Sequence, residues 1–401
     1  MIKKNSDSLP RKILKRKKKD KLFRWIGWGA VYFILLLFSF FLGGIFIKAA
    51  PIFQKQEVML SVQIPKNFSL PLTSGEAYKI IEKSFDKDNI VYKDVLSLNA
   101  WKILIQELHR KTNKRKQGTY FVWLPIKYKV KQEYKEEKKT LPVVWLEKKQ
   151  QEGKVRTGFN WEFFSNSDSL SPETAGIKSA LLGTLFVLFI SFIVAFPVGF
   201  LVAIYLECFL KKETKLSYFI SVNINNLAAI PSIIFGLLGI AIFLNFFHLP
   251  RSSSLVGGLT LSLMMLPLVI VSSRMSLSQV PNNLKEAALA LGASKTQAVF
   301  HFIVPVAIPG VITGLLLSFA RIIGETAPLL MVGMIVFLPK APTTLDSPAT
   351  VFPVQIYQWF QRPEEGFIEA SSGAIVILLL LLILINILAF FIRKKFQKFN
   401  R

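Results

Sequence analysis

Two ionisable residues interrupt an otherwise uncharged stretch in the last third of the chain. Arg321 and Glu325 are the only charges between Thr296 and Pro339, so they fall far from either end of a run long enough to cross a bilayer. A guanidinium is a permanent, fork-shaped donor that suits tetrahedral oxyanions, and a carboxylate can orient it or accept a proton. Their spacing predicts one shared helix face. Two interpretations follow: a polar passage for an anion, or a self-neutralising structural pair.

Other polar residues in apolar surroundings extend this group. Thr326 directly follows Glu325 and adds a hydroxyl. A second polar stretch lies inside another apolar run and contains Asn225, Asn226 and Ser232 around a helix-breaking proline. These three residues either line the same passage or only pack and cap the helix that carries them.

Six apolar runs are long enough to position these residues. A bilayer requires unbroken runs, whereas a soluble core disperses apolar residues at helix or strand period. Of the 401 residues, 52% are apolar, and they are concentrated in the runs. Six transmembrane helices are therefore predicted, within Trp25–Ile47, Ser179–Leu206, Leu216–Pro250, Ser252–Ser273, Thr296–Pro339 and Ala370–Ile392.

The net charge of +25 lies mainly at the two termini and in one long segment between the first two runs. Residues 1–24 carry +9, 48–175 carry +8, 176–392 carry +3 and 393–401 carry +5. Basic clusters beside apolar spans stay in the cytoplasm, so both termini are expected there and the number of spans must be even. Topology and anionic lipid account for the basic excess, and no nucleic-acid partner is expected.

The expected fold class is an all-α polytopic membrane protein with six helices and a small α+β extracytoplasmic domain between helices 1 and 2. The 23-residue first run exceeds the apolar core of a signal peptide, so we interpret it as a retained anchor. A single cysteine, Cys208, excludes an intrachain disulfide framework. The expected parts are a basic cytoplasmic N-terminus (1–24), the anchor (25–47), the extracytoplasmic domain (48–175), a five-helix domain (176–392) with a cytoplasmic loop (274–304), and a basic cytoplasmic tail (393–401).

The segment 48–175 shows helix and strand signals without a catalytic constellation. Thr73 and Glu76 have the spacing of a capping box, and helices are predicted at 77–85 and 95–109. Stretches of β-branched and aromatic residues predict strands at 119–125, 126–130 and 141–146. No metal-ligand spacing occurs, which favours a docking or packing module. Ser171 is the predicted N-cap of the second span.

The loop 274–304 carries a compact Ala-rich helix. Glu286, Ala287 and Ala288 favour a short helix, and Gly292 permits a tight turn into the next one. The two alanines allow close approach of a partner, although Glu-Ala-Ala is also simply good helix composition. The spacing from Glu-Ala-Ala through Gly292 to Pro305 resembles the EAA loop of ABC-importer permeases. In that family the loop sits in a groove of a cytoplasmic ATPase and couples nucleotide-driven closure to the membrane helices.

Four further motifs extend the resemblance over almost the whole chain. They are residues 223–232 before FGLLG, Gly-Glu-Thr-Ala-Pro at 324–328, residues 353–357 with 362–364, and FNWEFF at 159–164. Together they resemble the PstA-type permease of the phosphate-specific ABC importer, in a subgroup with an N-terminal extracytoplasmic extension. The resemblance implies a type I-like permease in the bacterial inner membrane. It also implies a PstC-type second permease, a PstB-type ATPase dimer and a PstS-type phosphate-binding protein as partners.

No phosphate-binding G-x-x-x-x-G-K-[ST] motif occurs in the sequence, so the chain is not expected to be an enzyme. ATP and Mg are expected on the partner ATPase, and no cofactor or metal is expected on this chain. Two rival functions are open. The chain can serve another oxyanion importer, for sulfate or molybdate, or it can be a membrane-anchored sensor that detects a ligand through residues 48–175.

Overall fold

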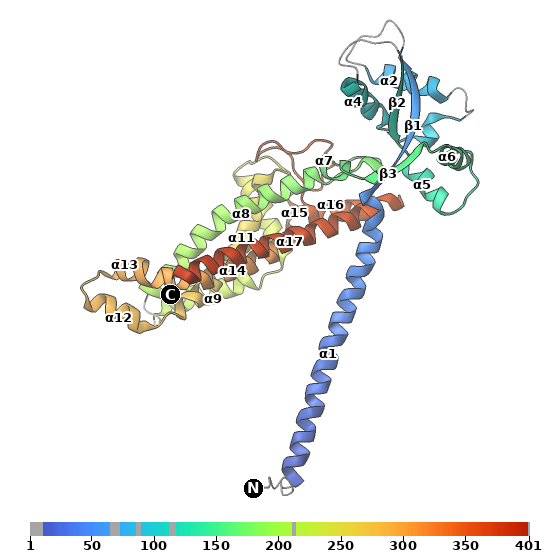
Figure 1. Ribbon diagram of the computed structural model, residues 1–401. Coiled ribbons are helices and arrows are strands. Elements are labelled where there is room, and N and C mark those ends of the chain that lie inside the picture. Colours follow the sequence, from blue (N-terminus) through green and yellow to red (C-terminus); the bar gives the residue numbers. More distant parts are fainter. Residues whose placement is uncertain (1–10, 65–72, 86–89, 112–117, 211–213, 400–401) are drawn as a thin grey trace. The chain divides into compact units, whose positions relative to one another are not determined.

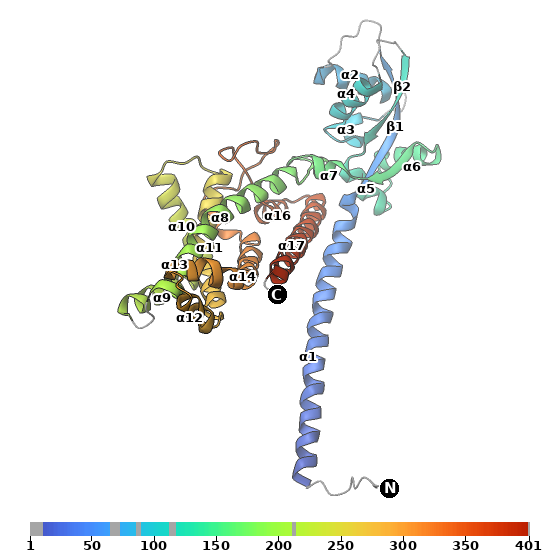
Figure 2. The same cartoon turned by 60° about the vertical axis from the view of Figure 1, so that its left-hand side comes forward.

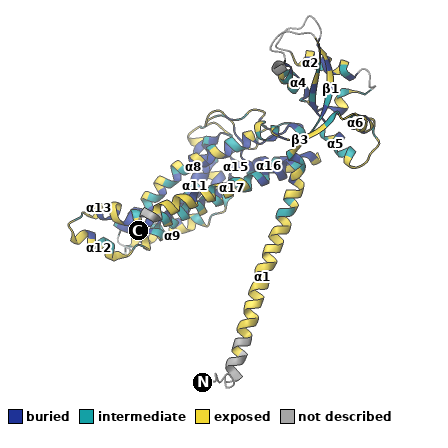
Figure 3. Ribbon diagram, viewed as in Figure 1, coloured by how far each residue is buried: buried dark blue, intermediate teal, exposed yellow. Residues whose placement is uncertain are grey.

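The computed structural model describes residues 11–64, 73–85, 90–111, 118–210 and 214–399 (Figure 1). The chain divides into two compact units between Lys48 and Ala49. The described residues of the first unit belong to a single helix, α1 (Arg11–Ala49), whose apolar side chains are exposed on all sides (Figure 3). A helix that is apolar around its whole circumference suits a lipid environment.

The second unit is built on long apolar helices. Four of these helices are long and apolar enough to cross a membrane. Together with the apolar part of α1, they give five candidate membrane spans among the described residues. The expected span 216–250 is broken into α9 (Lys215–Ala228) and α10 (Ser232–Gly239), which are bent by 99°. Pro231 lies at the break, where it cannot donate a helical hydrogen bond. Six spans are reached only if this pair counts as one. The four long helices are α8 (Lys178–Ile204), α11 (Ser254–Ser278), α14 (Val304–Ile323) and α17 (Glu365–Phe399).

Helix α11 packs against both α8 and α14, and α14 packs in turn against α17 (Figure 2). Small residues allow this close approach. A Cβ added at Gly258 of α11 would lie 2.6 Å from Ile190 Cβ on α8, and one added at Gly310 of α14 would lie 2.8 Å from Ser276 Oγ on α11. Lipid tails give helices no hydrophobic reason to associate, so close backbone packing of this kind holds a membrane bundle together.

Short elements join the long helices. Three π-helical segments continue α8, continue α10 and precede α14: η3 (Tyr205–Phe209), η4 (Ile240–Phe246) and η5 (Ala298–Ile303). The other connecting elements are η1 (Ala50–Phe53), α7 (Glu162–Ser165), η2 (Pro172–Thr174), α12 (Asn282–Ala290), α13 (Lys295–Gln297), α15 (Ala327–Met331) and α16 (Phe352–Phe360).

The described residues between 54 and 159 form a sheet domain. Its central strand, β1 (Gln54–Ile64), pairs antiparallel with β2 (Gly118–Pro125) and with β3 (Val155–Phe159). Alternate residues of β1 face the core, which contains Val58, Leu60, Val62 and Ile64. The helices of this domain are α2 (Ser74–Phe85), α3 (Tyr92–Val95), α4 (Ala100–Lys111), α5 (Tyr128–Lys135) and α6 (Leu141–Gln151).

The sequence predictions for this domain are partly right. The strand at 119–125 is confirmed by β2 and the helix at 77–85 by α2, whereas 95–109 divides between α3 and α4. The strands predicted at 126–130 and 141–146 are wrong, because α5 begins at Tyr128 and α6 begins at Leu141. Pro142 is a helix-start signal, since the first turn of a helix does not need its N–H. The sequence prediction does not include β1 or β3.

One predicted cap is confirmed and one is wrong. Thr73 N donates to Glu76 Oε2 at 2.9 Å and Glu76 N donates to Thr73 Oγ1 at 3.4 Å, which is the reciprocal pattern of a capping box. Ser171 does not cap the second span, because α8 begins only at Lys178 and Ser171 precedes the short turn η2 instead.

A half-buried carboxylate lies where the sheet domain meets the segment that leads into α8. Glu173, in η2, lies beside Ser97 and the backbone of Tyr128, and both of these residues belong to the sheet domain. Burial raises the pKa of the Glu173 carboxyl, against the opposing effects of these polar neighbours and of the nearby Lys127. Burying the ionised form therefore costs free energy at neutral pH.

We expect Glu173→Gln to raise the thermal unfolding midpoint at pH 7.5 and to leave it nearly unchanged at pH 4.5. Because the folded-state pKa is raised, the folded chain binds more protons than the unfolded chain between the ordinary glutamate pKa and the raised value. Its free energy of unfolding therefore falls as pH rises through that window. The measurement is thermal unfolding in detergent at a series of pH values, with exposed Glu137→Gln as control. An equal shift at all pH values would contradict the assignment.

Candidate functional site

The loop 274–304 contains a helix, a tight turn and a second helix start. Figure 2 shows α12 and α13 at one end of the helix bundle. Gly292 lies between them with a φ of +89°, a left-handed conformation in which a residue with a Cβ is strained. Ser294 and Gln297 form a capping box at the start of α13. The turn predicted at Gly292 is therefore confirmed.

Helix α12 has an outer face and a face turned toward its own chain. Glu286 and Ala287 are exposed, whereas Ala288 is only 3% exposed and α12 packs against η5. The Ala288 side chain is already covered by its own chain, and the role of both alanines in receiving a partner stays a prediction. Glu286 and Ala287 stay available for a partner.

Two lysines attach the loop to the end of α8. Lys285 Nζ donates to the Cys208 carbonyl at 3.5 Å, and Lys295 Nζ donates to the Phe209 carbonyl at 3.3 Å. Both acceptors lie in η3, where terminal carbonyls lack intrahelical partners and a cation suits the helix dipole. Sequence reasoning does not find either lysine, because the bonded residues are 77 and 86 positions away.

An ion pair adds a further link at the same end of the bundle. Arg274 Nε of α11 lies 3.6 Å from Glu207 Oε2 in η3, and the Glu207 side chain is only 8% exposed. Arg274 Nη1 also donates to Ser221 Oγ on α9 at 2.8 Å. One guanidinium thus joins α11, α9 and the end of α8. No sequence motif marks this group, which sits at the first position of the predicted loop.

Arg321 and Glu325 do not share a helix. Helix α14 ends at Ile323 and Gly324 is its C-cap, so Glu325 lies in the irregular stretch before α15. The predicted common face is therefore wrong, because that geometry needs an unbroken helix. Arg321 is exposed and Glu325 half-buried, and within the described part of the chain no ion pair joins them. The structure gives no support to a self-neutralising pair.

The two helix breaks bring Ser232 and Thr326 to neighbouring helix starts. A Cβ added at Gly236 of α10 would lie 2.9 Å from both Pro328 Cα and Met331 Cβ of α15, so this glycine allows the two helices to pack closely. Ser232 is the first residue of α10 and Thr326 is the N-cap of α15. Helices α10 and α15 pack together. Ser232 and Thr326, which lie in two separate apolar runs of the sequence, are therefore found at two neighbouring helix breaks.

Asn225 and Asn226 lie near the end of α9, across the 99° bend from Ser232. Both are exposed in the described chain, so their amides face outward rather than packing inside the bundle. Their role in a passage stays a prediction.

The segment 342–369 packs against the residues that precede α8. It contains α16, and Trp359 is completely buried. Trp359 Nε1 donates to Asp168 Oδ1 at 2.8 Å, and Arg362 Nη2 donates to Asp168 Oδ2 at 3.1 Å. The Asp168 carboxylate is fully buried. Asp168, Trp359 and Arg362 form a clamp that holds the segment preceding α8 against the end of α16.

The comparisons with known proteins agree with these features. A model of the family described as "Binding-protein-dependent transport system inner membrane component" matches residues 195–401, and one described as "Domain of unknown function (DUF3333)" matches residues 10–141. The phosphate transport system permease protein PstA 1 of Mycobacterium tuberculosis is 31% identical over 218 residues, which cover 54% of this chain and 70% of that protein. The chain belongs to the PstA-type permeases.

Other PstA-type permeases match to a similar extent. The phosphate transport system permease protein PstA of Haemophilus influenzae is 32% identical, over 50% of this chain and 70% of its own length. That of Pasteurella multocida is 32% identical, over 55% and 78%. Among solved structures, an inward-facing MetNI methionine ABC transporter has a TM-score of 0.43 at 19% identity, and covers 55% of this chain and 95% of its own.

In this PstA-type permease, the transport-family match starts inside α8 and includes the loop 274–304 and both helix breaks. Most of the sheet domain falls instead within the match to the domain of unknown function.

Proposed function

We propose that this PstA-type permease is the membrane subunit of an ATP-driven importer of inorganic phosphate. The observation that supports coupling most directly is the loop, which exposes Glu286 and Ala287 while Lys285 attaches it to the end of α8. An ATPase that binds the exposed face of α12 acts on α8 through the hydrogen bonds that Lys285 and Lys295 donate to the carbonyls of η3. The sequence has no phosphate-binding motif for ATP, so ATP and Mg bind to a partner ATPase.

The partners follow from the family and from the placement of charge. A PstB-type ATPase dimer binds the loop 274–304, a PstC-type permease completes the translocation path, and a PstS-type protein delivers phosphate. The loop and the basic termini face the cytoplasm of a bacterium, and the sheet domain lies on the opposite side of the inner membrane.

The helix breaks supply polar groups for an anion inside the membrane domain. Ser232 and Thr326 offer hydroxyl donors, and Arg321, in the last turn of α14, supplies a permanent positive charge. Glu325 can take up a proton from hydrogen phosphate or orient a cation of the second permease. Alternating access at the boundary between the two permeases moves phosphate inward.

Reconstitution of the chain with candidate partners in liposomes tests this function. We expect ATP-dependent accumulation of labelled phosphate, with little inhibition by a roughly tenfold excess of sulfate or molybdate, because specificity is a difference of affinities. Equal competition by sulfate would favour the other oxyanion importer. A chain that purifies from its native membrane without any ATPase would favour the sensor.

We expect Glu325→Gln to lower phosphate uptake about tenfold, equivalent to ~1.4 kcal/mol in the transport barrier. The amide keeps the size of the side chain but cannot carry charge. Uptake into proteoliposomes measures the effect, with the exposed Glu364→Gln as matched control. Unchanged uptake would remove Glu325 from the passage.

A further inference from the structure

An aromatic patch lies where the sheet domain meets the helix bundle. The patch consists of Phe53, Phe159, Trp161 and Phe164. Phe159 and Trp161 are 52% and 73% exposed, and their ring centroids are 4.9 Å apart. Phe53 stacks on Phe159 at 6.4 Å, and Trp161 lies 6.3 Å from Phe164. Large rings left in water lose the hydrophobic stabilisation that burial would give them.

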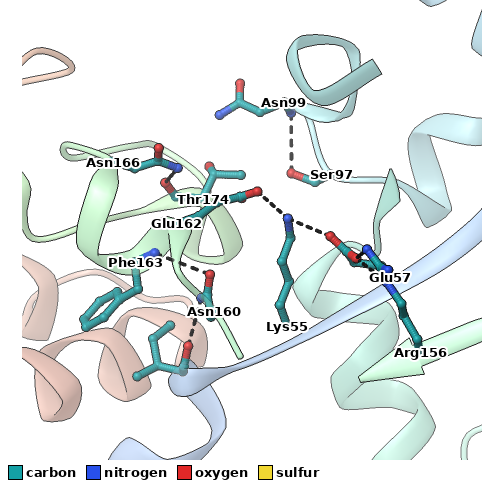
Figure 4. A network of polar contacts seen from close by, with 11 residues as sticks. Lys55, Glu57, Ser97, Asn99, Arg156, Asn160, Glu162, Phe163, Asn166 and Thr174 are labelled. Atoms are coloured by element: carbon teal, nitrogen blue, oxygen red, sulfur yellow. Dashed lines mark hydrogen bonds and ion pairs between the residues drawn. The ribbon is translucent and has the colours of Figure 1, made fainter. Parts of the chain in front are cut away.

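Asn160, which is only 4% exposed, fixes the backbone that carries the patch. Figure 4 shows the hydrogen bonds of its side chain. Asn160 N donates to the Phe53 carbonyl at 2.9 Å, and Asn160 Nδ2 donates to the Ile52 carbonyl at 2.8 Å. Its Oδ1 accepts a hydrogen bond from Phe163 N at 3.3 Å. Asn160 and Phe163 thus point inward while Phe159 and Trp161 point outward, so the exposure of the two rings is fixed by the backbone.

The patch lies at the ends of two candidate membrane spans. Phe53 is the last residue of the candidate span Lys19–Phe53. Behind Trp161, the Phe163 carbonyl accepts a hydrogen bond from Ile177 N at 2.8 Å, and Ile177 is the N-cap of α8. The patch is therefore attached, through the chain and through this bond, to the ends of two helices that are long and apolar enough to cross a membrane.

We propose that the aromatic patch inserts into the headgroup layer of the phospholipid bilayer and anchors the base of the sheet domain there. Trp rings favour this layer because an apolar ring and an N–H donor are both satisfied in it. The continuity of the patch with two span ends selects lipid over a soluble partner. The FNWEFF motif then has a physical reason: outward Phe159 and Trp161 for lipid, inward Asn160 and Phe163 for the fold.

Depth-dependent fluorescence quenching of the full chain tests this anchor. The chain is reconstituted in phosphatidylethanolamine and phosphatidylglycerol vesicles, and the emission of Trp161 is obtained as wild type minus Trp161→Phe. A nitroxide on the lipid headgroup is expected to quench this emission at least about twofold more than a nitroxide near the acyl-chain end, and iodide is expected to quench it weakly. Trp123, on β2 with Arg156 4.4 Å from its ring, is the matched control, taken from Trp123→Phe. It is expected to be insensitive to both lipid probes.

Two results would overturn the proposal. Strong iodide quenching of Trp161 with no lipid quenching would place the patch in water. Loss of lipid quenching when the partner subunits are reconstituted with the chain would show that a protein covers it. Phe159→Trp in the Trp161→Phe background supplies a second reporter on the same patch and is expected to give the same order of quenching.

Discussion

Glu286→Lys is expected to abolish ATP-driven phosphate uptake and to leave the thermal stability of the chain unchanged. The Glu286 side chain is exposed, whereas the fold of α12 depends on buried Ala288 and on the bond from Lys285 to Cys208. Charge reversal therefore breaks no hydrogen bond or ion pair among the described residues, but it repels any cationic surface of a docked ATPase. A loss of at least about tenfold in uptake corresponds to ~1.4 kcal/mol of coupling.

The measurement compares uptake with ATP hydrolysis in the same proteoliposomes. ATPase activity is expected to persist without phosphate transport. Gln279→Lys is the matched control, because it introduces the same side chain at an exposed position at the end of α11, outside the Glu-Ala-Ala motif. Normal uptake by Glu286→Lys, or an equal loss in the control, would show that this face of α12 does not receive the motor.

Asp168→Ala is expected to lower the free energy of unfolding by ~3 kcal/mol, because the buried indole N–H of Trp359 loses its acceptor and the partly buried Arg362 guanidinium loses its counter-ion. Asp168 is fully buried and accepts from Trp359 at 2.8 Å and from Arg362 at 3.1 Å. Thermal unfolding in detergent measures the loss. Asp168→Asn keeps an acceptor for Trp359 and is expected to lose less.

A double-mutant cycle separates the ion pair from the rest of the clamp. The double mutant Asp168→Ala with Arg362→Met lacks both charges. Its loss in free energy of unfolding is therefore expected to be smaller than the sum of the losses in the two single mutants. Additive losses would mean that Arg362 contributes through its other contacts, the hydrogen bond to the Ser169 carbonyl at 2.7 Å and the Phe367 ring 4.3 Å from the guanidinium carbon.

The long helices could be predicted from sequence because a lipid environment leaves a one-dimensional signal. The sheet domain could be predicted only in part. Segments such as 141–146 are rich in β-branched and aromatic residues, but in a run this short composition does not separate strand from helix. Pro142 and the helical spacing of Val143 and Leu146 indicate a helix, as α6 shows. In β1, apolar and polar residues alternate, which indicates a strand, but composition alone does not detect this alternation.

The residue types of the candidate site could be predicted from the sequence, but the positions of these residues relative to one another could not. Gly292 carried its own signal, because only glycine readily adopts its backbone conformation. The shared face expected for Arg321 and Glu325 failed because Gly324 ends α14 between them. Asp168 carried no signal at all, since Trp359 and Arg362 are 191 and 194 residues away. Contacts across such separations depend on the packing of the whole bundle.

Helix α8 is bonded at both of its ends to other parts of the chain. At one end, Lys285 and Lys295 hold the carbonyls of η3, and near the other, Thr184 Oγ1 accepts a hydrogen bond from Phe352 N of α16 at 2.9 Å. A helix of 27 residues is about 40 Å long. A displacement applied at the loop would therefore reach α16 along a single run of helix, from η3 through α8.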